Sequence, residues 1–402
     1  MNKPPLSDIR VIDLSHVVAG PYCTMLLADL GAEVIKIENP IKPDLSREIG
    51  PLISDSEGRK YSARFLGLNR NKKAITLNLK HPKGKVILKD LVKLCDVLVE
   101  NFSPGVMEKL GLGYKVLYEL NPKLVYAAIS GFGHLEPTPF QDRPSFDIIA
   151  QAMGGLMEMT GDPEGAPVRT GVSVGDYYPS LMAAFAIMVA LHARTNTGRG
   201  QMVDVAMYDS IVSLTEAFVA DYSLTKEAKT RMGNVLNAPY GIFMAKDGYM
   251  VIAALSQDMW ERLCHVMGKS EYINDPRLRT FSDRRENFQK CFAPILKEWI
   301  SQKEKNEVIN LLLKNKIPAA PVNTIKDLFE CPHLAARGML TPVPHPVLGS
   351  FLLSGIPFKL SEMSARPHTS PPDLGQNNPE ILGKLLGYSE SDLGKLREDG
   401  VI

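Results

Sequence analysis

Apolar and polar positions in the first forty residues follow two alternating patterns. Residues 10–15 form a short β-branched run, residues 22–30 have helical spacing, and residues 32–38 form a second β-branched run. Pro21 is tolerated in the first turn of a helix, and Gly31 suits its end. The N-terminal segment is therefore predicted to be a strand–helix–strand unit with parallel strands.

Two further strands are predicted over residues 96–102 and 124–130. Each follows a stretch with helical spacing, residues 84–93 and 116–120. Strands that alternate with helices indicate an α/β domain with a largely parallel sheet, in which ligands bind at the carboxyl ends of the strands. The turn after the first strand has no GxGxxG pattern, which disfavours an oxidoreductase that binds a dinucleotide.

From about residue 225 the pattern changes. Residues 237–255 are predicted to form a hairpin that turns at residues 246–248, because Asp-Gly between alternating apolar residues suits a tight turn. Helical spacing follows over residues 259–267 and 286–313. The mixture of a hairpin and helices differs from the alternation seen earlier and indicates a separate domain.

Three segments follow from these patterns. Residues 1–224 are predicted to form the large α/β domain, and residues 225–330 a smaller α+β domain. Residues 341–376 are too rich in proline for a helix and are predicted to be extended, and residues 378–402 are predicted to form a last helix. Residues 331–402 thus form an extended strap that ends in a helix.

Composition and charge exclude several classes of partner. The chain of 402 residues has a net charge of +1, with 45% hydrophobic and 23% charged residues, as in soluble globular proteins. A near-neutral chain has no overall field to attract nucleic acid or an anionic membrane, so neither partner is expected. The longest apolar run, residues 181–191, is shorter than the ~20 residues that span a bilayer. A strand pattern begins by Val11, which leaves no room for a signal peptide, and a cytoplasmic protein is expected.

The cysteine and histidine spacings offer no metal site. The 5 cysteines are scattered, and none forms a CxxC pair or a zinc-finger spacing with histidine. HExxH and clustered carboxylates do not occur either. The sequence predicts neither a disulfide framework nor a bound metal.

Asp176 is the only formal charge between Arg169 and Arg194, and it follows Gly171 and Gly175. One interpretation makes it the N-cap of a helix, because Asp is a favoured capping residue. The other makes it a nucleophile, because a desolvated carboxylate beside an activated acyl group can attack that group. The local sequence leaves both interpretations open.

A basic stretch is the one candidate for binding phosphate groups. Its members are Arg70, Lys72, Lys73, Lys80, Lys83 and Lys85. Such a stretch usually forms a solvated face, but a phosphate-rich ligand would need one in a protein whose net charge is close to zero.

Several segments, taken in order, carry a resemblance to a known family. They are "VIDLSHVVAGPYCTMLLADLGAEVIKIE", "NRNKKAITLNLK", "DVLVENFSPGVMEKLGLGY", "FDIIAQAMGGLM", "PVRTGVSVGD", "TGRGQMVDVAMYDS" and the tail with "PPDLGQ" and "GVI". Their order and spacing resemble the class III coenzyme A transferases, which include formyl-CoA, carnitinyl-CoA and succinyl-CoA-dependent transferases and the α-methylacyl-CoA racemases. The resemblance implies a Rossmann-like large domain built from both chain ends, a smaller α+β domain, and a homodimer of interlocked rings.

The resemblance implies that Asp176 is the catalytic nucleophile. In this family the carboxylate attacks the donor thioester to form a mixed anhydride, which coenzyme A converts into an aspartyl-CoA thioester for the acceptor acid to attack. This chemistry needs no tightly bound cofactor, since the CoA thioester is itself the substrate. The implied coenzyme contacts are His16, Val18, Ala19, Lys72, Lys73, Asn101, Phe102, Lys109 and Met207.

Three positions bear on the acyl group. Racemases of the family carry His where this chain has Phe146, so no imidazole is present there to return a proton, and a racemase or epimerase is the alternative within the family. The formyl-CoA/oxalate enzymes have a glycine run where this chain has only isolated glycines such as Gly241. A succinyl-CoA-like donor and a small dicarboxylic or hydroxy acid are therefore expected. Arg169 either meets the distal carboxylate of that acid or forms a structural ion pair.

A non-catalytic CoA-ester-binding protein is the alternative from another class.

Overall fold

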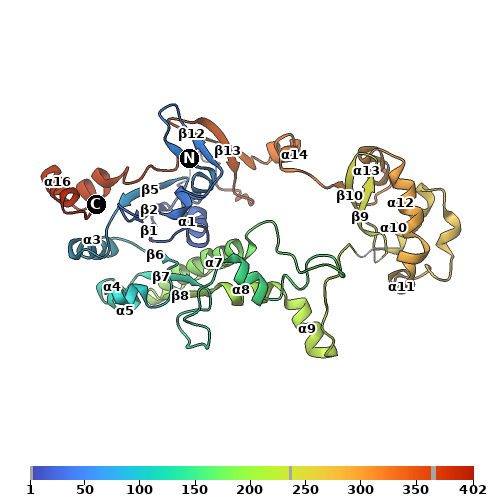
Figure 1. The fold of residues 1–402 in the computed structure, drawn as a ribbon, viewed down its shortest axis with the longest axis horizontal. Helices are drawn as coiled ribbons and strands as arrows, with labels where there is room; N and C mark the ends of the chain where they lie inside the picture. The colour runs from blue at the N-terminus through green and yellow to red at the C-terminus, as the bar shows by residue number, and fades with distance from the viewer. Residues whose placement is uncertain (1–2, 235–237, 364–367) are drawn as a thin grey trace. The chain divides into compact units, whose positions relative to one another are not determined.

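Six parallel strands form the central sheet of the protein (Figure 1). Their order is β5-β2-β1-β6-β7-β8, and every neighbouring pair runs parallel. The bounds are β1 (Arg10–Asp13), β2 (Glu33–Glu38), β5 (Lys72–Thr76), β6 (Val97–Glu100), β7 (Val125–Ser130) and β8 (Met202–Ala206). The predicted α/β class with a parallel sheet is confirmed, and the four predicted strands are all present.

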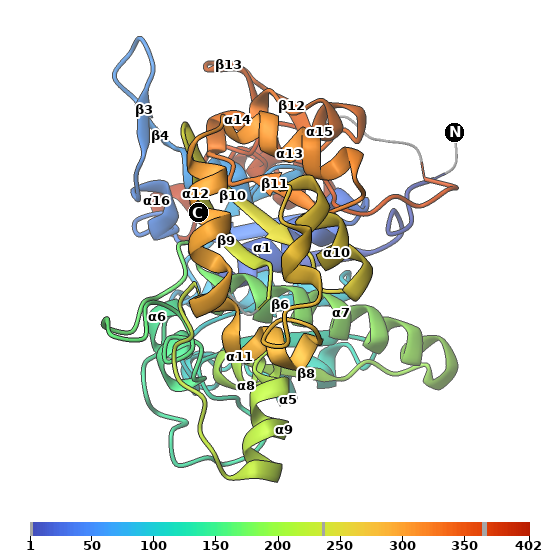
Figure 2. The same ribbon diagram turned by 90° about the vertical axis from the view of Figure 1, so that its right-hand side faces the viewer.

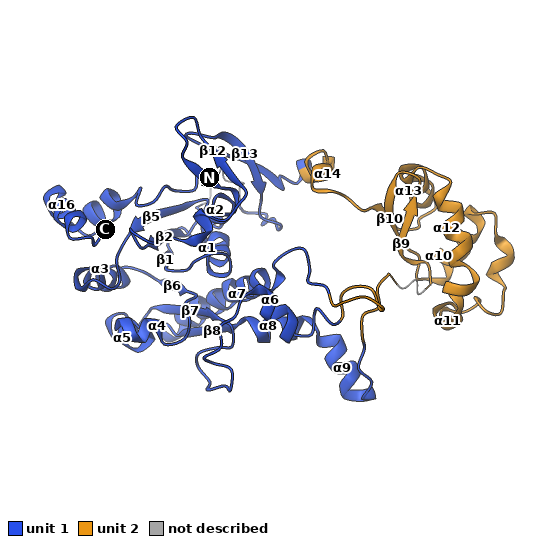
Figure 3. Ribbon diagram, viewed as in Figure 1, with its two compact units in different colours: residues 1–158, 168–229, 335–402 blue, residues 159–167, 230–334 orange. Residues whose placement is uncertain are grey.

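The computed structural model describes residues 3–234, 238–363 and 368–402. Two compact units emerge (Figure 3). The larger unit combines residues 1–158, 168–229 and 335–402, and the smaller one combines residues 159–167 and 230–334. The sequence placed the smaller domain at 225–330 and gave no sign that residues 159–167 belong with it.

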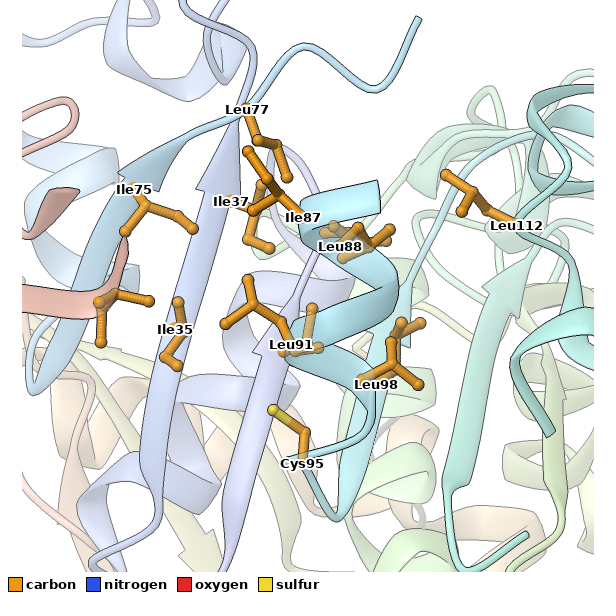
Figure 4. Close-up of a cluster of buried hydrophobic side chains, with 14 of the residues drawn as sticks. Ile35, Ile37, Ile75, Leu77, Ile87, Leu88, Leu91, Cys95, Leu98 and Leu112 are labelled. Carbon is orange, nitrogen blue, oxygen red and sulfur yellow. The ribbon is translucent and has the colours of Figure 1, made fainter. Parts of the chain in front are cut away.

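Each strand of the sheet sends alternate side chains to opposite faces. On β1, Val11 faces a layer formed by α1 (Ala19–Asp29), α7 (Val174–Thr197) and α8 (Met207–Leu214). Ile12 faces the opposite layer, which includes α3 (Pro82–Val92). Figure 4 shows Ile87, Leu88 and Leu91 of α3 lying over Ile35, Ile37 and Leu98 of the sheet. Both faces are covered, as is usual for a parallel sheet.

The larger unit contains further helices and strands besides the central sheet and the helices already named. Their bounds are β3 (Leu52–Ser54), β4 (Lys60–Ser62), α2 (Ala63–Leu68), α4 (Val106–Leu110), α5 (Tyr114–Leu120), α6 (Asp147–Met153), α9 (Glu216–Thr225), β12 (Leu340–His345), β13 (Gly349–Ser354) and α16 (Glu390–Glu398). Part of the proline-rich passage is the regular β12–β13 hairpin, and its residues 364–367 lie outside the described residues. The rest of the passage that the structure describes has no helix, as predicted. The predicted last helix is interrupted, because a short helical segment, Pro379–Leu385, precedes α16.

The C-terminal segment covers the free edge of the sheet. β5 is the edge strand, and its Ala74 and Thr76 amides donate to the side-chain oxygens of Asn377 and Asn378, both at 2.9 Å. Asn377 also donates its own amide to the Ala74 carbonyl at 2.8 Å. Unpaired edge strands invite association with other chains, so these asparagines both complete and protect the sheet.

Helix α7 has the length and composition of a membrane-spanning helix. In this protein one side of it is buried against the sheet through Ala183, Ile187 and Leu191. Its opposite side leaves Phe185 and Val189 exposed. A half-buried helix of this kind is also found in the cores of soluble proteins, so length and composition alone do not assign it to a bilayer.

The smaller unit is an antiparallel sheet packed on helices (Figure 2). Its elements are β9 (Tyr240–Ala245), β10 (Gly248–Ala253), β11 (Ala319–Pro321), α10 (Gln257–Val266), α11 (Phe281–Cys291), α12 (Ala293–Ser301), α13 (Lys305–Lys314), α14 (Ile325–Phe329) and, at the junction with the larger unit, α15 (Pro332–Ala336). The predicted hairpin is present as β9 and β10. The helical spacing predicted over 286–313 is present as parts of three helices, α11, α12 and α13. The break before α12 lies near Pro294, because proline favours the first turn of a new helix.

Buried ion pairs support the turn after β1. The Lys72 ammonium donates to Asp13 Oδ2 at 3.0 Å, to the Pro21 carbonyl at 2.9 Å and to Asn69 Oδ1 at 2.9 Å, and its side chain is 0% exposed. Burial raises the pKa of Asp13, but the charges of Lys72 and Lys36 outweigh it and hold that pKa at about 2. The carboxylate is therefore ionised at neutral pH.

Removing one partner of this pair should destabilise the fold. Lys72→Met leaves the buried Asp13 carboxylate without its cation and is expected to lower the free energy of unfolding by about 3–5 kcal/mol. Lys73→Met is the matched control, because Lys73 is 33% exposed in its pairs with Glu33 and Glu380 and should cost about 1 kcal/mol or less. Urea denaturation measures both, and equal losses would contradict the assignment.

Candidate active site

Asp176 lies in the first turn of α7 rather than at its cap. The helix begins at Val174, and Ser173 is the N-cap residue. The Asp176 amide donates to the Ser173 carbonyl at 2.9 Å, and its carbonyl accepts from the Ser180 hydroxyl at 2.5 Å. The N-cap interpretation of Asp176 is therefore wrong, because the helix starts two residues before it, at Val174. A carboxylate in this turn faces the positive end of the helix dipole.

A second carboxylate, that of Asp147, holds the start of α7 in place. Its Oδ1 accepts the Gly175 amide at 2.8 Å and the Gln151 side-chain amide, also at 2.8 Å. A Cβ atom on residue 175 would lie 2.6 Å from the Asp147 carbonyl oxygen, so this position requires glycine. Gln151 in turn accepts the Thr170 amide at 3.0 Å. The sequence did not identify Asp147 and Gln151 as site residues, because no local motif marks the contact between Asp147 and Gly175.

The surroundings of Asp176 weaken its tendency to ionise. Burial, with a further contribution from the neighbouring Asp147 charge, raises its pKa to about 7 against the opposing positive charge of Arg64. Asp176 is therefore partly protonated at neutral pH and becomes fully ionised as the pH rises. A carboxylate that is poorly solvated in this way is more reactive toward an acyl group than one in water.

Arg169 forms an ion pair with the same cluster. Its Nη1 lies 3.7 Å from Asp147 Oδ2, and the Arg169 side chain is 53% exposed. Of the two interpretations left open by the sequence, the structure shows the ion pair. Arg64, an exposed residue of α2, is the cation that the sequence did not single out, and its charge acts on both Asp176 and Tyr177.

The predicted coenzyme contacts at the ends of the first and third predicted strands meet at one edge of the sheet. Asn101 Oδ1 accepts the His16 amide at 2.8 Å, and Asn101 Nδ2 donates to the His16 carbonyl at 2.9 Å. The rings of His16 and Phe102 lie 5.5 Å apart. Val18 and Ala19 follow at the start of α1 and are buried. The turns after β1 and β6 thus form a single cluster at the carboxyl end of the sheet, where ligands bind in this class of fold.

Lys72 and Lys73 do not lie in this cluster, which corrects the sequence prediction. Both stand at the start of β5, a strand that the sequence did not predict. The Lys72 ammonium is buried and its three hydrogens are used within the protein. Lys73 pairs with Glu33 at 2.6 Å and Glu380 at 2.7 Å near the opposite, amino-terminal edge. Lys80, which follows the carboxyl end of β5, is the lysine of the basic stretch on the ligand edge.

The other predicted residues are spread over several elements. Lys109 is exposed in the last turn of α4, and Met207 is buried at the start of α8. Phe146 is 71% exposed and is the N-cap residue of α6, directly before Asp147. Gly241 lies on β9 of the smaller unit. The loop that leads to β9 includes residues 235–237, which lie outside the described residues.

A cavity of about 740 Å³ in the larger unit lies away from these groups. It is lined by residues that include Glu33, Asn71, Lys73 and Phe358, at the amino-terminal edge of the sheet. Asp176 and the turns after β1 and β6 do not line it. The carboxylate at the start of α7 therefore defines the candidate site, and this cavity does not.

Comparison with known proteins places the fold and the site in an enzyme class. Residues 6–378 match the model of CoA-transferase family III, and the chain belongs to that family. It is 41% identical to succinyl-CoA:mesaconate CoA-transferase of Haloarcula hispanica over 383 residues, 94% of this chain and 95% of that protein. It is 38% identical to succinyl-CoA–D-citramalate CoA-transferase of Chloroflexus aurantiacus, over 99% of this chain and 98% of that protein. The protein is thus an enzyme, a CoA-transferase.

A solved structure agrees with this placement. The crystal structure of a CAIB/BAIF family protein from Brucella suis superposes with a TM-score of 0.86 at 33% sequence identity, covering 96% of this chain and 100% of that one. The mixed α/β fold with a parallel sheet is therefore that of the family.

The two carboxylates predict a pH effect that can be measured without turnover. Asp147→Asn keeps an oxygen that accepts the Gly175 amide but removes the charge, so the pKa of Asp176 should fall by about one unit. More Asp176 would then be ionised at pH 7. Carbon-13 titration of the aspartate carboxyls measures the shift, with the exposed Asp142→Asn as control. An unchanged or raised pKa in Asp147→Asn would contradict the electrostatic role of Asp147.

Proposed function

We propose that the protein transfers coenzyme A from a succinyl-CoA-like donor to a small dicarboxylic or hydroxy acid, with Asp176 as the nucleophile. The observation that carries the proposal is the half-buried Asp176 carboxylate in the first turn of α7, with its pKa raised to about 7. The names of several relatives support the donor, because the mesaconate, citramalate and glutarate enzymes all use succinyl-CoA. These relatives are 35–41% identical to this chain.

The reaction exchanges one thioester for another. A carboxylate oxygen of Asp176 attacks the thioester carbonyl, the carbon–sulfur bond breaks, and the CoA thiolate leaves a mixed aspartyl–acyl anhydride. The thiolate then attacks the aspartyl carbonyl, releases the donor acid and forms an aspartyl-CoA thioester. The acceptor carboxylate attacks this thioester, and the returning thiolate takes the new acyl group and frees Asp176. No electrons are transferred overall, and no tightly bound cofactor is proposed.

Exclusion of water supports this route, since an anhydride hydrolyses readily. Tyr177 follows Asp176, and its ring packs edge-on against Tyr22 of α1 at 4.7 Å. Burial raises the pKa of both tyrosines, so they remain neutral. Two neutral aromatic rings beside the carboxylate favour a dry environment over a hydrated one.

The acids that the relatives use are consistent with a cation near Asp176. Mesaconate, citramalate and glutarate each have two carboxylates, and only one is activated by coenzyme A. Arg64 is exposed and its charge reaches Asp176, so we propose that it receives the distal carboxylate. Arg169 is less suited to this role because it is paired with Asp147.

Racemisation is the weaker alternative. Phe146 precedes Asp147 at the position where racemases carry His, and a phenyl ring cannot move a proton. The ring also cannot remove a proton from the acyl group of an acyl-CoA. Transfer between acids needs only the nucleophile and coenzyme A.

We further propose that two copies form the interlocked homodimer implied by the family, in the cytoplasm. Helix α9 supports the dimer, because none of its residues is buried, and Tyr222 and Leu224 are exposed at 52% and 84%. Exposed apolar groups of this size mark an interface. Light scattering should give twice the chain's mass of 44.3 kDa, and a monomer would contradict the dimer.

One experiment tests the nucleophile and the acids together. Acyl-CoA donors and free acids are incubated with the protein, the intermediate is trapped with hydroxylamine or borohydride, and the modified residue is located by mass spectrometry. Label on Asp176 and a loss of turnover of about a thousandfold or more in Asp176→Ala are expected. Asp209→Ala is the matched control, because Asp209 also lies in the first turn of a helix with its pKa raised by burial. Turnover that survives Asp176→Ala would overturn the mechanism.

The role of Arg64 has a separate prediction. In Arg64→Gln the KM for a dicarboxylic acceptor such as glutarate should rise about tenfold, the effect of one lost charged hydrogen bond. The KM for butyrate, which has no distal carboxylate, should stay the same. Arg337→Gln, at another exposed arginine, serves as the control. A parallel change for both acids would show that Arg64 does not distinguish them.

A further inference from the structure

Glu100 is a buried acid that the proposed mechanism does not use. It ends β6 directly before Asn101 and is 2% exposed. Its Oε2 accepts the Phe102 amide at 2.7 Å, and its Oε1 accepts the Tyr126 hydroxyl at 3.2 Å. Glu100 therefore links β7, through Tyr126, to the turn that follows β6.

That turn carries the cluster with His16. Asn101 holds both the amide and the carbonyl of His16, at 2.8 and 2.9 Å, and the Phe102 ring lies against the imidazole. The Phe102 amide is held by the Glu100 carboxyl group. A shift of the Glu100 side chain would free that amide and move Asn101 and Phe102 relative to His16.

We propose that Glu100 is a positioning residue: its carboxyl group holds the Asn101–Phe102 turn in the conformation that binds the coenzyme. The inference rests on the proposed function, because the contacts of His16, Asn101 and Phe102 with coenzyme A are part of it. Glu100 itself is too deeply buried to touch the ligand. It acts through the backbone of Phe102.

The ionisation of Glu100 makes its hydrogen bond with the Phe102 amide sensitive to pH. The acids that act on it are Glu108 of α4 and Asp204 of β8, and the third group facing it is the Tyr126 hydroxyl of β7. Burial, reinforced by the two acids, raises the pKa of Glu100 to about 7. The hydrogen bonds from the Phe102 amide and the Tyr126 hydroxyl act in the opposite direction, since both favour the ionised carboxylate. By linkage these bonds are stronger when Glu100 is ionised, so the turn is held best above pH 7 and less firmly as the pH falls through about 7.

The test uses the whole protein and coenzyme A itself as the probe. Calorimetry gives the dissociation constant between pH 6 and 8, and steady-state kinetics with succinyl-CoA gives KM and kcat. In the wild type the dissociation constant should fall as the pH rises through about 7. In Glu100→Gln it should match the wild-type value at pH 6 and change less with pH, because the amide resembles the protonated acid and does not titrate, whereas Asp176 still does.

Two further variants separate positioning from folding. Glu100→Ala removes the acceptor of the Phe102 amide and should raise KM about tenfold at every pH, with kcat within about twofold. Tyr126→Phe removes only the hydroxyl and should give a smaller rise in KM. This variant tests the positioning role even if Glu100→Ala does not fold. Glu119→Ala, at an exposed acid of α5, is the control and should leave KM unchanged.

The outcomes distinguish this inference from the proposed function. A pH step of unchanged size in Glu100→Gln, or a fall in kcat at constant KM in the variants, would overturn the positioning role and leave CoA transfer standing. Tight binding of coenzyme A with the expected pH step, but without label on Asp176, would overturn the mechanism and leave the positioning role standing. Wild-type protein that binds no coenzyme A would overturn both.

Discussion

The contact between the Asp147 carboxylate and the Gly175 amide holds the turn that carries Asp176, and the same carboxylate adds to the effect of burial on the pKa of Asp176. The amide belongs to the residue directly before Asp176, so the first turn of α7 cannot move without breaking this 2.8 Å hydrogen bond. The same carboxylate also disfavours ionisation of Asp176. The Asp147 carboxylate thus both orders the start of α7 and raises the pKa of Asp176. Only a glycine at position 175 lets α6 and α7 approach closely enough for this contact. Arg169 reduces the effect on the pKa by neutralising part of the Asp147 charge.

The carboxyl edge of the sheet gathers groups that are remote in sequence. Asn101 and His16 are 85 positions apart and are joined by two hydrogen bonds. Beneath the turn of His16, Lys36 donates to the Ser15 carbonyl at 2.8 Å and pairs with Asp44, with both side chains 0% exposed. These buried charges have no role at the surface of the site, yet they fix the backbone on which it is built.

The sequence predicted the parallel sheet, because strand and helix periodicities are local. It was wrong about Lys72 and Lys73 for a reason of geometry. Residues that are adjacent in a strand point to opposite faces, so one of the two lysines is buried against Asp13 and the other meets Glu33. A run of basic residues in a sequence cannot reveal this when the strand itself is unrecognised. Asp147 was missed because its contact with residue 175 depends on how α6 packs against α7.

The asparagines that cover β5 also bear on how the chain is made. Asn377 and Asn378 lie 303 and 302 positions after the strand residues they bind, so β5 is synthesised long before its cover exists. At the usual rate of translation, the interval is about 15–60 seconds. Throughout that time the nascent chain presents an open strand edge with unsatisfied amides. A growing polypeptide in this state needs shielding from its neighbours on the same messenger RNA, and chaperone contact at this stage would protect it from premature pairing.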